Sequence, residues 1–344
     1  MEQKNFSIQQ GNIYLEITSR CNLKCSYCYN DSNARGVDLD IEKIYEIMDY
    51  SISCGVNSIA IFGGEPFLHN GIFDILHHAA SVGMHIYLVT NGSLLSEDIC
   101  HKILEYNNIL KFQFSFDGAN AETHGLTRGQ NNFYNIINCI TFLVHNGFDD
   151  SVYVRYNLME YNYGKILEFV DLCGGIGVRN ISFSEILDQG RASQNQVVSL
   201  INIKDKEIKS TVMRQIESAR KKYPNIEIKY SPKVTVSCPY AINEKNKSIQ
   251  FLPRIDSLGN VYLCQAEVNT NRIIGNIYDT SLADIVVSKE LCELINYITD
   301  KSSRNKNCTT CAFKSICGGG CIAVTSPCEK IKTQLIHDFI YMEK

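Results

Sequence analysis

The sequence contains no apolar run near the roughly 20 residues that a membrane-spanning helix requires, and its first ten residues are too polar for a secretory signal peptide. It has no excess of basic residues either, because 33 Lys and Arg stand against 37 Asp and Glu, a formal net charge of −4. Without a positive field, neither nucleic acid nor an anionic membrane is an expected partner. We therefore expect a cytoplasmic globular protein, and 344 residues suit one large domain or two ordinary ones.

Cysteine, by contrast, is abundant, with 15 residues in the chain. Because a reducing cytosol does not favour disulfides, clustered cysteines there more often bind metal or carry out redox chemistry. Three cysteines form one tight group, seven lie in the last third of the chain, and five are scattered singly, at Cys54, Cys100, Cys139, Cys173 and Cys292. We interpret the first ten as ligands and the scattered five as small buried apolar residues.

Short β-type runs alternate with helical patterns from residue 13 to about residue 185. The runs cover residues 13–18, 58–62, 85–90, 111–116, 152–158 and 180–184, and the helical segments residues 40–54, 71–82, 95–106, 133–146, 164–173 and 204–223. This alternation predicts a parallel sheet with helices outside it. Six units are too few for a closed eight-stranded barrel, and no GxGxxG follows the first run, so the expected fold class is α/β, a partial and open (β/α)6 TIM-like barrel.

The character of the chain changes between Pro224 and Pro232. We expect the barrel to occupy residues 1–225 and a second, Cys-rich and irregular domain to occupy residues 226–344. The second part carries a hairpin signal around residues 258–260 and a helical pattern near residues 331–342.

Cys21, Cys25 and Cys28 have the spacing Cys-x3-Cys-x2-Cys and follow the first β-type run directly. Three thiolates at this spacing can bind three irons of a 4Fe–4S cluster and leave the fourth iron open to a substrate. The loops after the strands of a βα barrel build its active face, so the place of this group also indicates function. A zinc site or buried thiols are the alternative, although three cysteines without a fourth ligand fit structural zinc poorly.

This loop resembles that of the radical S-adenosylmethionine (SAM) superfamily, which places an aromatic residue, here Tyr27, before the third cysteine. Elements similar to the family's GGE, TNG and S-x-DG motifs, and to its H-D-x-x-R-G element with Gly125 in place of Asp, follow in order over about the first 190 residues. The resemblance implies that Glu65 accepts hydrogen bonds from the methionine ammonium of SAM. The residues it implies in cofactor binding are Tyr27, Gly63, Gly64, Glu65, Asn91, Ser115 and Arg128.

The C-terminal cysteines include a Cys-x2-Cys-x5-Cys-x3-Cys array, which alone fits a zinc ribbon as well as an iron–sulfur site. With Cys238 and the Gly259-x4-Cys264 element before it, the array resembles the SPASM extension of radical SAM enzymes, which holds two auxiliary 4Fe–4S clusters. Cys238 lies farther before Gly259 than is usual in the family. The resemblance implies seven thiolates and one vacant iron, with one cluster on Cys238, Cys264 and Cys321 and the other on Cys308, Cys311, Cys317 and Cys328.

The resemblance implies an enzyme with three 4Fe–4S clusters that cleaves SAM to a 5′-deoxyadenosyl radical. That radical would abstract hydrogen from a ribosomally made peptide and lead to an oxidative modification or a thioether or carbon–carbon crosslink. The alternatives are a sulfatase-maturase-like or small-molecule-modifying radical SAM enzyme and, outside catalysis, an iron–sulfur electron carrier. Sulfatase maturases place an Asp after the Gly-x4-Cys element, where this chain has Gln265. Epimerisation would need a thiol at the active face, and four of the scattered cysteines, Cys54, Cys100, Cys139 and Cys173, fall within or at the ends of helical segments.

The expected partners are the peptide substrate and a flavodoxin- or ferredoxin-type electron donor. About a dozen residues precede the first run, so we expect leader recognition by a separate leader-binding protein or by the barrel, or a substrate that needs no leader. Gly190-Arg191-Ala192 resembles a stretch common in SPASM enzymes and is either a rim contact or a solvated loop. No catalytic side chain or general base can be assigned from the sequence.

Overall fold

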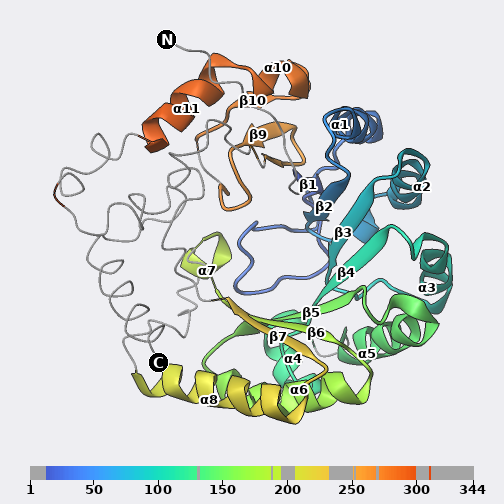
Figure 1. The fold of residues 1–344 in the computed structure, drawn as a ribbon, viewed down its shortest axis with the longest axis vertical. Coiled ribbons are helices and arrows are strands. Elements are labelled where there is room, and N and C mark those ends of the chain that lie inside the picture. Colours follow the sequence, from blue (N-terminus) through green and yellow to red (C-terminus); the bar gives the residue numbers. More distant parts are fainter. Residues whose placement is uncertain are drawn as a thin grey trace.

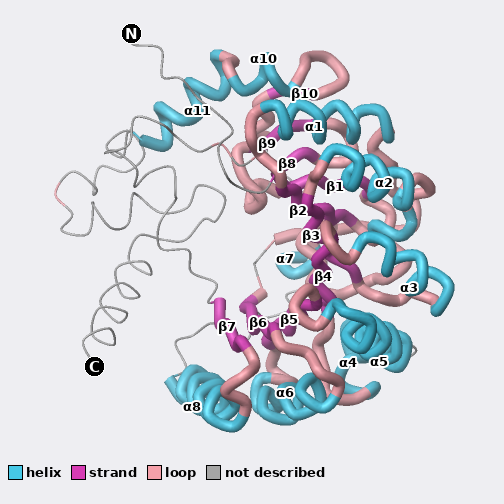
Figure 2. Tube along the Cα trace, turned by 45° about the vertical axis from the view of Figure 1, so that its right-hand side comes forward, coloured by secondary structure: helices cyan, strands magenta, loops and turns pink. Residues whose placement is uncertain are grey.

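The computed structural model describes residues 13–129, 132–186, 189–194, 206–231, 251, 253–268, 271–299 and 310. Their strands form one sheet in the order β10-β9-β8-β1-β2-β3-β4-β5-β6-β7. It curves around an open centre, with helices along its outer side (Figures 1 and 2). The strands are β1 (Ile13–Thr18), β2 (Ser58–Gly63), β3 (His85–Thr90), β4 (Leu110–Ser115), β5 (Val152–Leu158), β6 (Asn180–Glu185), β7 (Glu227–Ser231), β8 (Arg254–Ile255), β9 (Asn260–Tyr262) and β10 (Gly275–Asn276).

Strands β1 to β7 pair in parallel, neighbour to neighbour, so the predicted open barrel of six βα units is confirmed. The helices of the barrel are α1 (Ile41–Ser53), α2 (Ile72–Val82), α3 (Glu97–Ile103), α4 (Ala121–Arg128), α5 (Asn132–Leu143), α6 (Ile166–Gly175), α7 (Arg191–Gln194) and α8 (Lys206–Lys222). Short turns of other helix type are η1 (Pro66–Leu68), η2 (Leu104–Tyr106), η3 (Val144–Phe148) and η4 (Tyr163–Lys165).

The six predicted strands match β1 to β6 within a residue at each end. The sequence did not predict α4 or the seventh parallel strand, β7. Helix α4 is short and polar, and it begins where the Asn120 side chain accepts a hydrogen bond from Thr123 N at 2.9 Å. Strand β7 has only five residues with charged Glu227 and Lys229 exposed, a pattern too short and polar to separate from a loop.

The two faces of the parallel sheet differ in chemistry. On β4, Phe112 and Phe114 are fully buried against the outer helices, while Gln113 and Ser115, on the opposite face, are only half-buried. β5 shows the same alternation, and Arg155 on its inner face is exposed. Parallel sheets are commonly apolar on both faces. On β4 and β5 the inner face is polar, so the hydrophobic core of this part of the barrel lies between the sheet and the helices.

The hairpin predicted around residues 258–260 is confirmed by antiparallel β8 and β9, with Gly259 at φ +81° in the turn between them. β8 also pairs in parallel with β1, so the hairpin extends the barrel sheet beyond its first strand. Helices α10 (Leu282–Val286) and α11 (Lys289–Thr299) follow β10. The division at residue 225 stays a prediction, and β7 beyond it belongs to the barrel sheet. Pro232 and the helix predicted at 331–342 lie outside the described residues.

No helix in the part of the chain that the structure describes combines the length and apolar character needed to cross a membrane.

Candidate functional site

The loop between β1 and α1 carries the first three cysteines and lies across the carboxyl ends of the strands, in the open centre of the sheet (Figure 1). Its backbone packs directly on the glycines after β2. A Cβ on Gly64 would lie 1.9 Å from Arg20 O, and one on Gly63, at φ +150°, would lie 2.1 Å from Thr18 O. The absence of a side chain at these two glycines therefore lets the backbone of Thr18 and Arg20, where the cysteine loop begins, approach closely.

Nitrogen donors point at the sulfurs of this loop. Leu23 N lies 3.4 Å and Asn91 Nδ2 lies 3.9 Å from Cys21 Sγ, and one guanidinium nitrogen of Arg128 lies 3.9 Å from Cys25 Sγ. Burial raises the pKa of Cys21 to about 11, with the neighbouring Glu65, Cys25 and Cys28 adding to the rise. Thiolates held together in this way need a cationic group to stabilise them, which is the role that iron takes in a cluster.

The chemistry of the three side chains in this loop suits an iron–sulfur cluster. Cys21, Cys25 and Cys28 are free thiols, and a 4Fe–4S cluster takes one thiolate at each iron. Three thiols without a fourth ligand fit a structural zinc less well.

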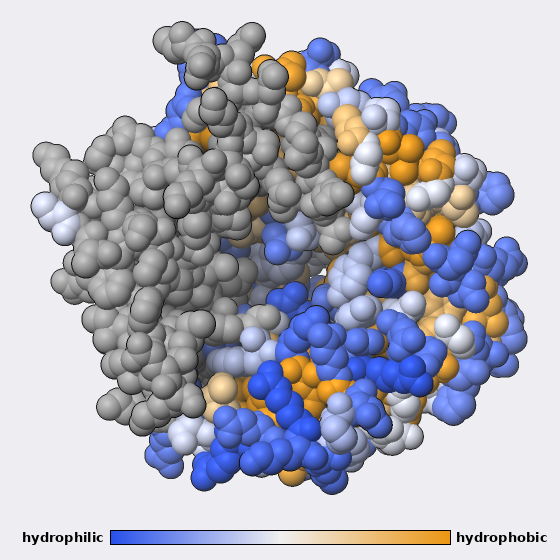
Figure 3. Space-filling view, in the orientation of Figure 1, coloured by the Kyte–Doolittle hydropathy of each residue, from blue (hydrophilic) through white to orange (hydrophobic). Residues whose placement is uncertain are grey.

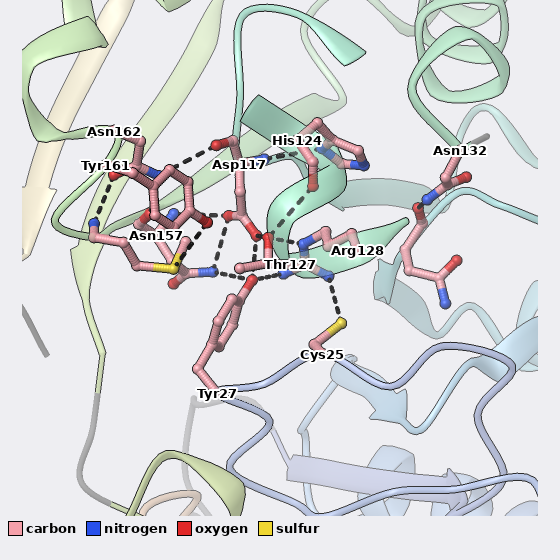
Figure 4. A network of polar contacts seen from close by, with 12 residues as sticks. Cys25, Tyr27, Asp117, His124, Thr127, Arg128, Asn132, Asn157, Tyr161 and Asn162 are labelled. Atoms are coloured by element: carbon pink, nitrogen blue, oxygen red, sulfur yellow. Dashed lines mark hydrogen bonds and ion pairs between the residues drawn. The ribbon is translucent and has the colours of Figure 1, made fainter. Parts of the chain in front are cut away.

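A buried polar network lies beneath Cys25 (Figure 4). Asp117 Oδ2 accepts from Arg128 Nε at 2.5 Å and from the Tyr27 hydroxyl, and Arg128 also donates to that hydroxyl. Asn157 N donates to Asp117 Oδ1 at 3.0 Å, and Asn157 Nδ2 donates to the Tyr27 hydroxyl at 3.1 Å. Tyr27 and Arg128, both expected at the cofactor, are therefore tied to the ends of β4 and β5, where they hold the cysteine loop.

Charge within this network is balanced. Burial by itself would raise the pKa of Asp117, but the adjacent Arg128 holds it below its ordinary value. Burial lowers the pKa of His124 to about 4, so this imidazole is neutral at pH 7, and its Nδ1 accepts from Asp117 N at 3.3 Å. The network thus contains one carboxylate and one guanidinium, and no net charge beneath the cysteine loop.

Glu65 is fully buried and joins the loops after β2 and β3. Its Oε1 accepts from Thr90 Oγ1 at 2.7 Å and from Phe67 N at 3.3 Å, and its Oε2 accepts from Asn91 N at 2.7 Å. Burial nevertheless raises the pKa of Glu65 to about 7, against the effect of these hydrogen bonds. A buried carboxyl of this kind gains by meeting an additional cation.

Arg155 is a residue that the sequence analysis missed. It pairs in register with Ser115 at the end of β4, on the polar inner face, and its guanidinium makes no hydrogen bond or ion pair with any residue that the structure describes. Its charge partly offsets the effect of burial, which raises the pKa of the nearby Tyr87 to about 12. The signal was present in the alternation of β5, which puts Arg155 and Asn157 on one face. Figure 3 shows hydrophilic residues around the hollow at the centre of this side of the molecule.

Gly190 and Arg191 clamp the cysteine loop from its other side. Arg191 N donates to Cys28 O and its Nε to Cys25 O, both at 2.9 Å, and the guanidinium also contacts Asp31 and Ser32. A Cβ on Gly190 would lie 2.3 Å from Tyr29 O. This arginine is therefore not solvated, and what it contacts is the backbone of the cysteine loop.

Some of the other cysteines lie in the part of the chain that the structure describes, and the rest lie outside it. Cys264 follows β9 and is half-buried, whereas Cys54 is exposed at the end of α1, so the interpretation of Cys54 as a buried apolar residue is wrong. Cys292 is only half-buried, and Cys100, Cys139 and Cys173 are buried as expected. The predicted ligands that lie outside the described residues are Cys238, Cys308, Cys311, Cys317, Cys321 and Cys328.

Two family models match the chain: the Radical SAM superfamily over residues 15–173, and SPASM, an iron–sulfur cluster-binding domain, over residues 252–312. The antilisterial bacteriocin subtilosin biosynthesis protein AlbA of Bacillus subtilis is 28% identical over 178 residues, which are 51% of this chain and 39% of AlbA. The AdoMet-dependent heme synthase of Methanosarcina barkeri is 34% identical over 116 residues, 33% of either protein. The chain thus spans well under half the length of both relatives.

A longer match is to the mycofactocin maturase MftC of Mycolicibacterium smegmatis, 23% identical over 320 residues, 90% of this chain and 77% of MftC. Among solved structures, Streptococcus suis SuiB bound to its precursor peptide SuiA superposes with a TM-score of 0.70 at 17% identity, over 92% of this chain and 72% of SuiB. AdoMet-bound anSMEcpe superposes with a TM-score of 0.65 at 17% identity, over 93% of this chain and 90% of anSMEcpe. These structural likenesses show the fold.

Proposed function

This chain is a radical SAM enzyme with a SPASM domain, and from that premise we propose that it oxidises or crosslinks a ribosomally made peptide. The observation that carries the proposal is the cysteine loop held at the mouth of a polar, open barrel, with the buried carboxyl of Glu65 beside it. The peptide as substrate is supported by the relatives, since AlbA is named a bacteriocin biosynthesis protein, MftC is named a maturase and SuiB was solved with a precursor peptide.

The chain's own residues bind and orient the cofactor in this proposal. Cys21, Cys25 and Cys28 hold three irons, and Glu65 accepts from the SAM ammonium. When bound, the cluster and SAM supply a 5′-deoxyadenosyl radical that abstracts hydrogen from the peptide. Ser115 and Arg155, side by side on β4 and β5, offer a hydroxyl and a cation to an anionic group such as a carboxylate.

We further propose two auxiliary 4Fe–4S clusters on the seven C-terminal cysteines, in addition to the SAM-binding one. Such a cluster, when held by these cysteines, would accept one electron from the peptide radical, and with one proton released to solvent this would complete a two-electron oxidation of the substrate. A flavodoxin- or ferredoxin-type protein would supply the first electron, and a separate leader-binding protein could present the peptide. The SPASM match over residues 252–312 supports iron–sulfur binding in this region.

The test is anaerobic reconstitution with iron and sulfide, followed by metal counting and chromatography for 5′-deoxyadenosine. We expect iron and sulfide for three clusters, SAM cleavage after reduction with dithionite, and loss of two hydrogen atoms from a co-expressed short peptide encoded beside the gene. Cleavage of SAM that leaves every such peptide unchanged in mass, while a small metabolite is consumed, would instead identify a small-molecule enzyme.

Replacing Glu65 by glutamine should weaken SAM binding about tenfold or more and leave the cluster bound. The physical reason is the loss of a charge-assisted hydrogen bond worth ~1.5 to 3 kcal/mol. Because the pKa of Glu65 is raised to about 7, its carboxyl must lose a proton to bind the ammonium at lower pH. Between pH 7 and 6 the wild-type affinity should therefore fall, toward tenfold per unit, with proton release visible by titration calorimetry.

The matched control is Thr90→Val, which removes the 2.7 Å hydrogen bond to Glu65 Oε1 and keeps the carboxyl. Since that bond favours the charged form, its loss should move the pH midpoint upward. A Glu65→Gln protein whose SAM affinity and pH profile equal those of the wild type would show that Glu65 only joins the two loops.

A further inference from the structure

Two buried thiols meet between the outer helices of the barrel. Cys100 lies on α3 and Cys139 on α5, and their Sγ atoms are 3.2 Å apart. The exposed fractions of the two residues are only 2% and 3%. The helices that carry them pack against each other on the outer side of the sheet (Figures 1 and 2). The proposed function makes no use of this pair, which belongs to the hydrophobic core.

Packing between α3 and α5 holds the two sulfurs together. The neighbouring residues His101 and Phe142 also meet across the two helices, with ring centroids 4.8 Å apart in an edge-to-face arrangement. The start of α3 is fixed by Ser96, whose hydroxyl accepts a hydrogen bond from Ile99 N at 3.3 Å. To reach a disulfide bond length of about 2.05 Å, the sulfurs need to approach by only about 1.2 Å.

The two thiols differ in acidity. The hydrogen bond between them holds the pKa of Cys100 below its ordinary value and raises the pKa of Cys139. Cys173, the other fully buried cysteine of the barrel helices, has its pKa raised by burial alone. Because the thiolate is the nucleophilic form of cysteine, Cys100 is the thiol of this pair that attacks an oxidant first.

Metal binding does not account for the pair. Among the described residues, no group of three Cys, His, Asp or Glu side chains able to hold a metal ion includes these two thiols. Two adjacent thiols of unequal acidity are instead the arrangement in which one sulfur is oxidised and the other resolves it into a disulfide.

The two helices also border a loop of the candidate site. Asn91, in the loop between β3 and α3, donates from its N to Glu65 Oε2 at 2.7 Å. Asn132, at the start of α5, donates from Nδ2 to Asn91 O at 3.1 Å. A Cβ on Gly92 would lie 3.0 Å from Ile136 Cγ1 on α5. A covalent bond between α3 and α5 would therefore fix both sides of the loop that binds Glu65.

We propose that Cys100 and Cys139 form a redox modification site, which a hydroperoxide such as hydrogen peroxide converts to a disulfide that fixes α3 to α5. The Cys100 sulfur attacks one peroxide oxygen, the O–O bond breaks, and the leaving hydroxide takes up the thiol proton as water. The Cys139 sulfur then displaces the hydroxyl group of the resulting sulfenic acid, which leaves with the Cys139 proton as a second water. Two electrons pass from the two sulfurs to the peroxide.

The size of the oxidant follows from the burial of the site. Helix α3 has only seven residues, and local opening of so short a segment admits a small uncharged molecule to the core. Oxidised glutathione, a pair of charged tripeptides, is too large to bring its disulfide against a sulfur that is 2% exposed. The site therefore selects hydroperoxides over low-molecular-weight disulfides.

The test treats the reconstituted full-length protein, under exclusion of air, with a small excess of hydrogen peroxide or of oxidised glutathione. Free thiols are then blocked with N-ethylmaleimide, and the protein is digested without reduction. Cleavage after aromatic residues separates Cys54 from Cys100, so mass spectrometry identifies the crosslinked peptides. We expect the Cys100–Cys139 crosslink in most molecules after peroxide, in few after glutathione, and its loss on addition of dithiothreitol.

Two variants accompany the wild type. Cys173→Ala, the matched change of a buried cysteine on α6, should keep the crosslink. Cys139→Ala should lose it and leave the sulfenic acid of Cys100, which dimedone traps. Should Cys139→Ala fail to fold, the comparison of the two oxidants on the wild type still decides the question.

Hydrogen exchange measures what the bond does to the fold. Backbone amides of residues 91–103 should exchange severalfold more slowly in the oxidised wild type than in the reduced one, and peroxide should not slow them in Cys139→Ala. The inference would be overturned if Cys100 and Cys139 both stayed free while exposed Cys54 reacted with peroxide. A crosslink that glutathione forms as readily, or exchange that the crosslink leaves unchanged, would also contradict it.

Discussion

Conversion of Cys21, Cys25 and Cys28 together to alanine is expected to reduce 5′-deoxyadenosine formation to background. These thiols are the proposed ligands of three irons of a 4Fe–4S cluster, whose fourth iron binds SAM. No other cysteine that the structure describes lies in this loop. Because the loop is anchored by backbone contacts at Arg20, Gly64 and Arg191, the variant should remain folded. The measurement is SAM cleavage after reduction with dithionite, together with iron counting.

The variant should lose the iron of one cluster and keep the remainder. Cys54→Ala is the matched control, since Cys54 is exposed at the end of α1, at the opposite edge of the barrel, and should retain full activity. Retained cleavage in the triple variant would contradict the assignment of this loop.

Replacing Arg128 by methionine is expected to destabilise the protein by about 3 to 5 kcal/mol, because Asp117 would remain buried without its partner. The pair is almost fully enclosed, with side-chain exposures of 8% and 0%. Since Arg128 also contacts Cys25 Sγ and the Tyr27 hydroxyl, the cysteine loop should lose order and bind iron poorly. Urea unfolding of the anaerobic apoprotein measures the loss, and reconstitution measures the iron.

The double variant Asp117→Asn with Arg128→Met separates charge from shape. With the buried carboxylate gone, much of the lost stability should return, because replacing both partners of a buried pair is often near neutral. The folded-state pKa of Asp117 is lowered, so its contribution is present above the ordinary Asp pKa of about 4 and is lost on acidification below it. If the double variant were as unstable as Arg128→Met alone, the lost free energy of unfolding would come from side-chain packing and not from the unpaired charge of Asp117.

The parts of the fold that could be predicted are those that local sequence patterns indicate. Six strands and their helices follow from apolar periodicity, because each buries one face against its neighbours. The motifs around Glu65, Asn91 and Ser115 were visible because each follows a strand, and parallel strands bring their carboxyl ends to one edge. β7 was missed because its five residues alternate charged and apolar positions with little burial.

The parts that could not be predicted depend on residues far apart in the chain. Arg254 meets Glu16 across 238 positions, and Arg191 meets Cys25 across 166, and neither pair leaves a local signal. Tyr27 and Arg128 show a related limit. A motif indicates that these residues belong to the site, but only the structure shows that their polar atoms meet Asp117 beneath the cysteine loop.

The polar inner face of the open sheet has a consequence for how such an enzyme changes its substrate. The apolar residues that stabilise β4 and β5 point outward to the helices, while Gln113 and Arg155 point inward and contribute little to the core. Alternate positions of one strand are therefore under separate selection, the outward positions for a stable core and the inward positions for binding. Inner positions can be exchanged during evolution, or in a library that randomises them, with small cost in folding free energy, so new specificities are reachable by single steps from a scaffold that stays intact.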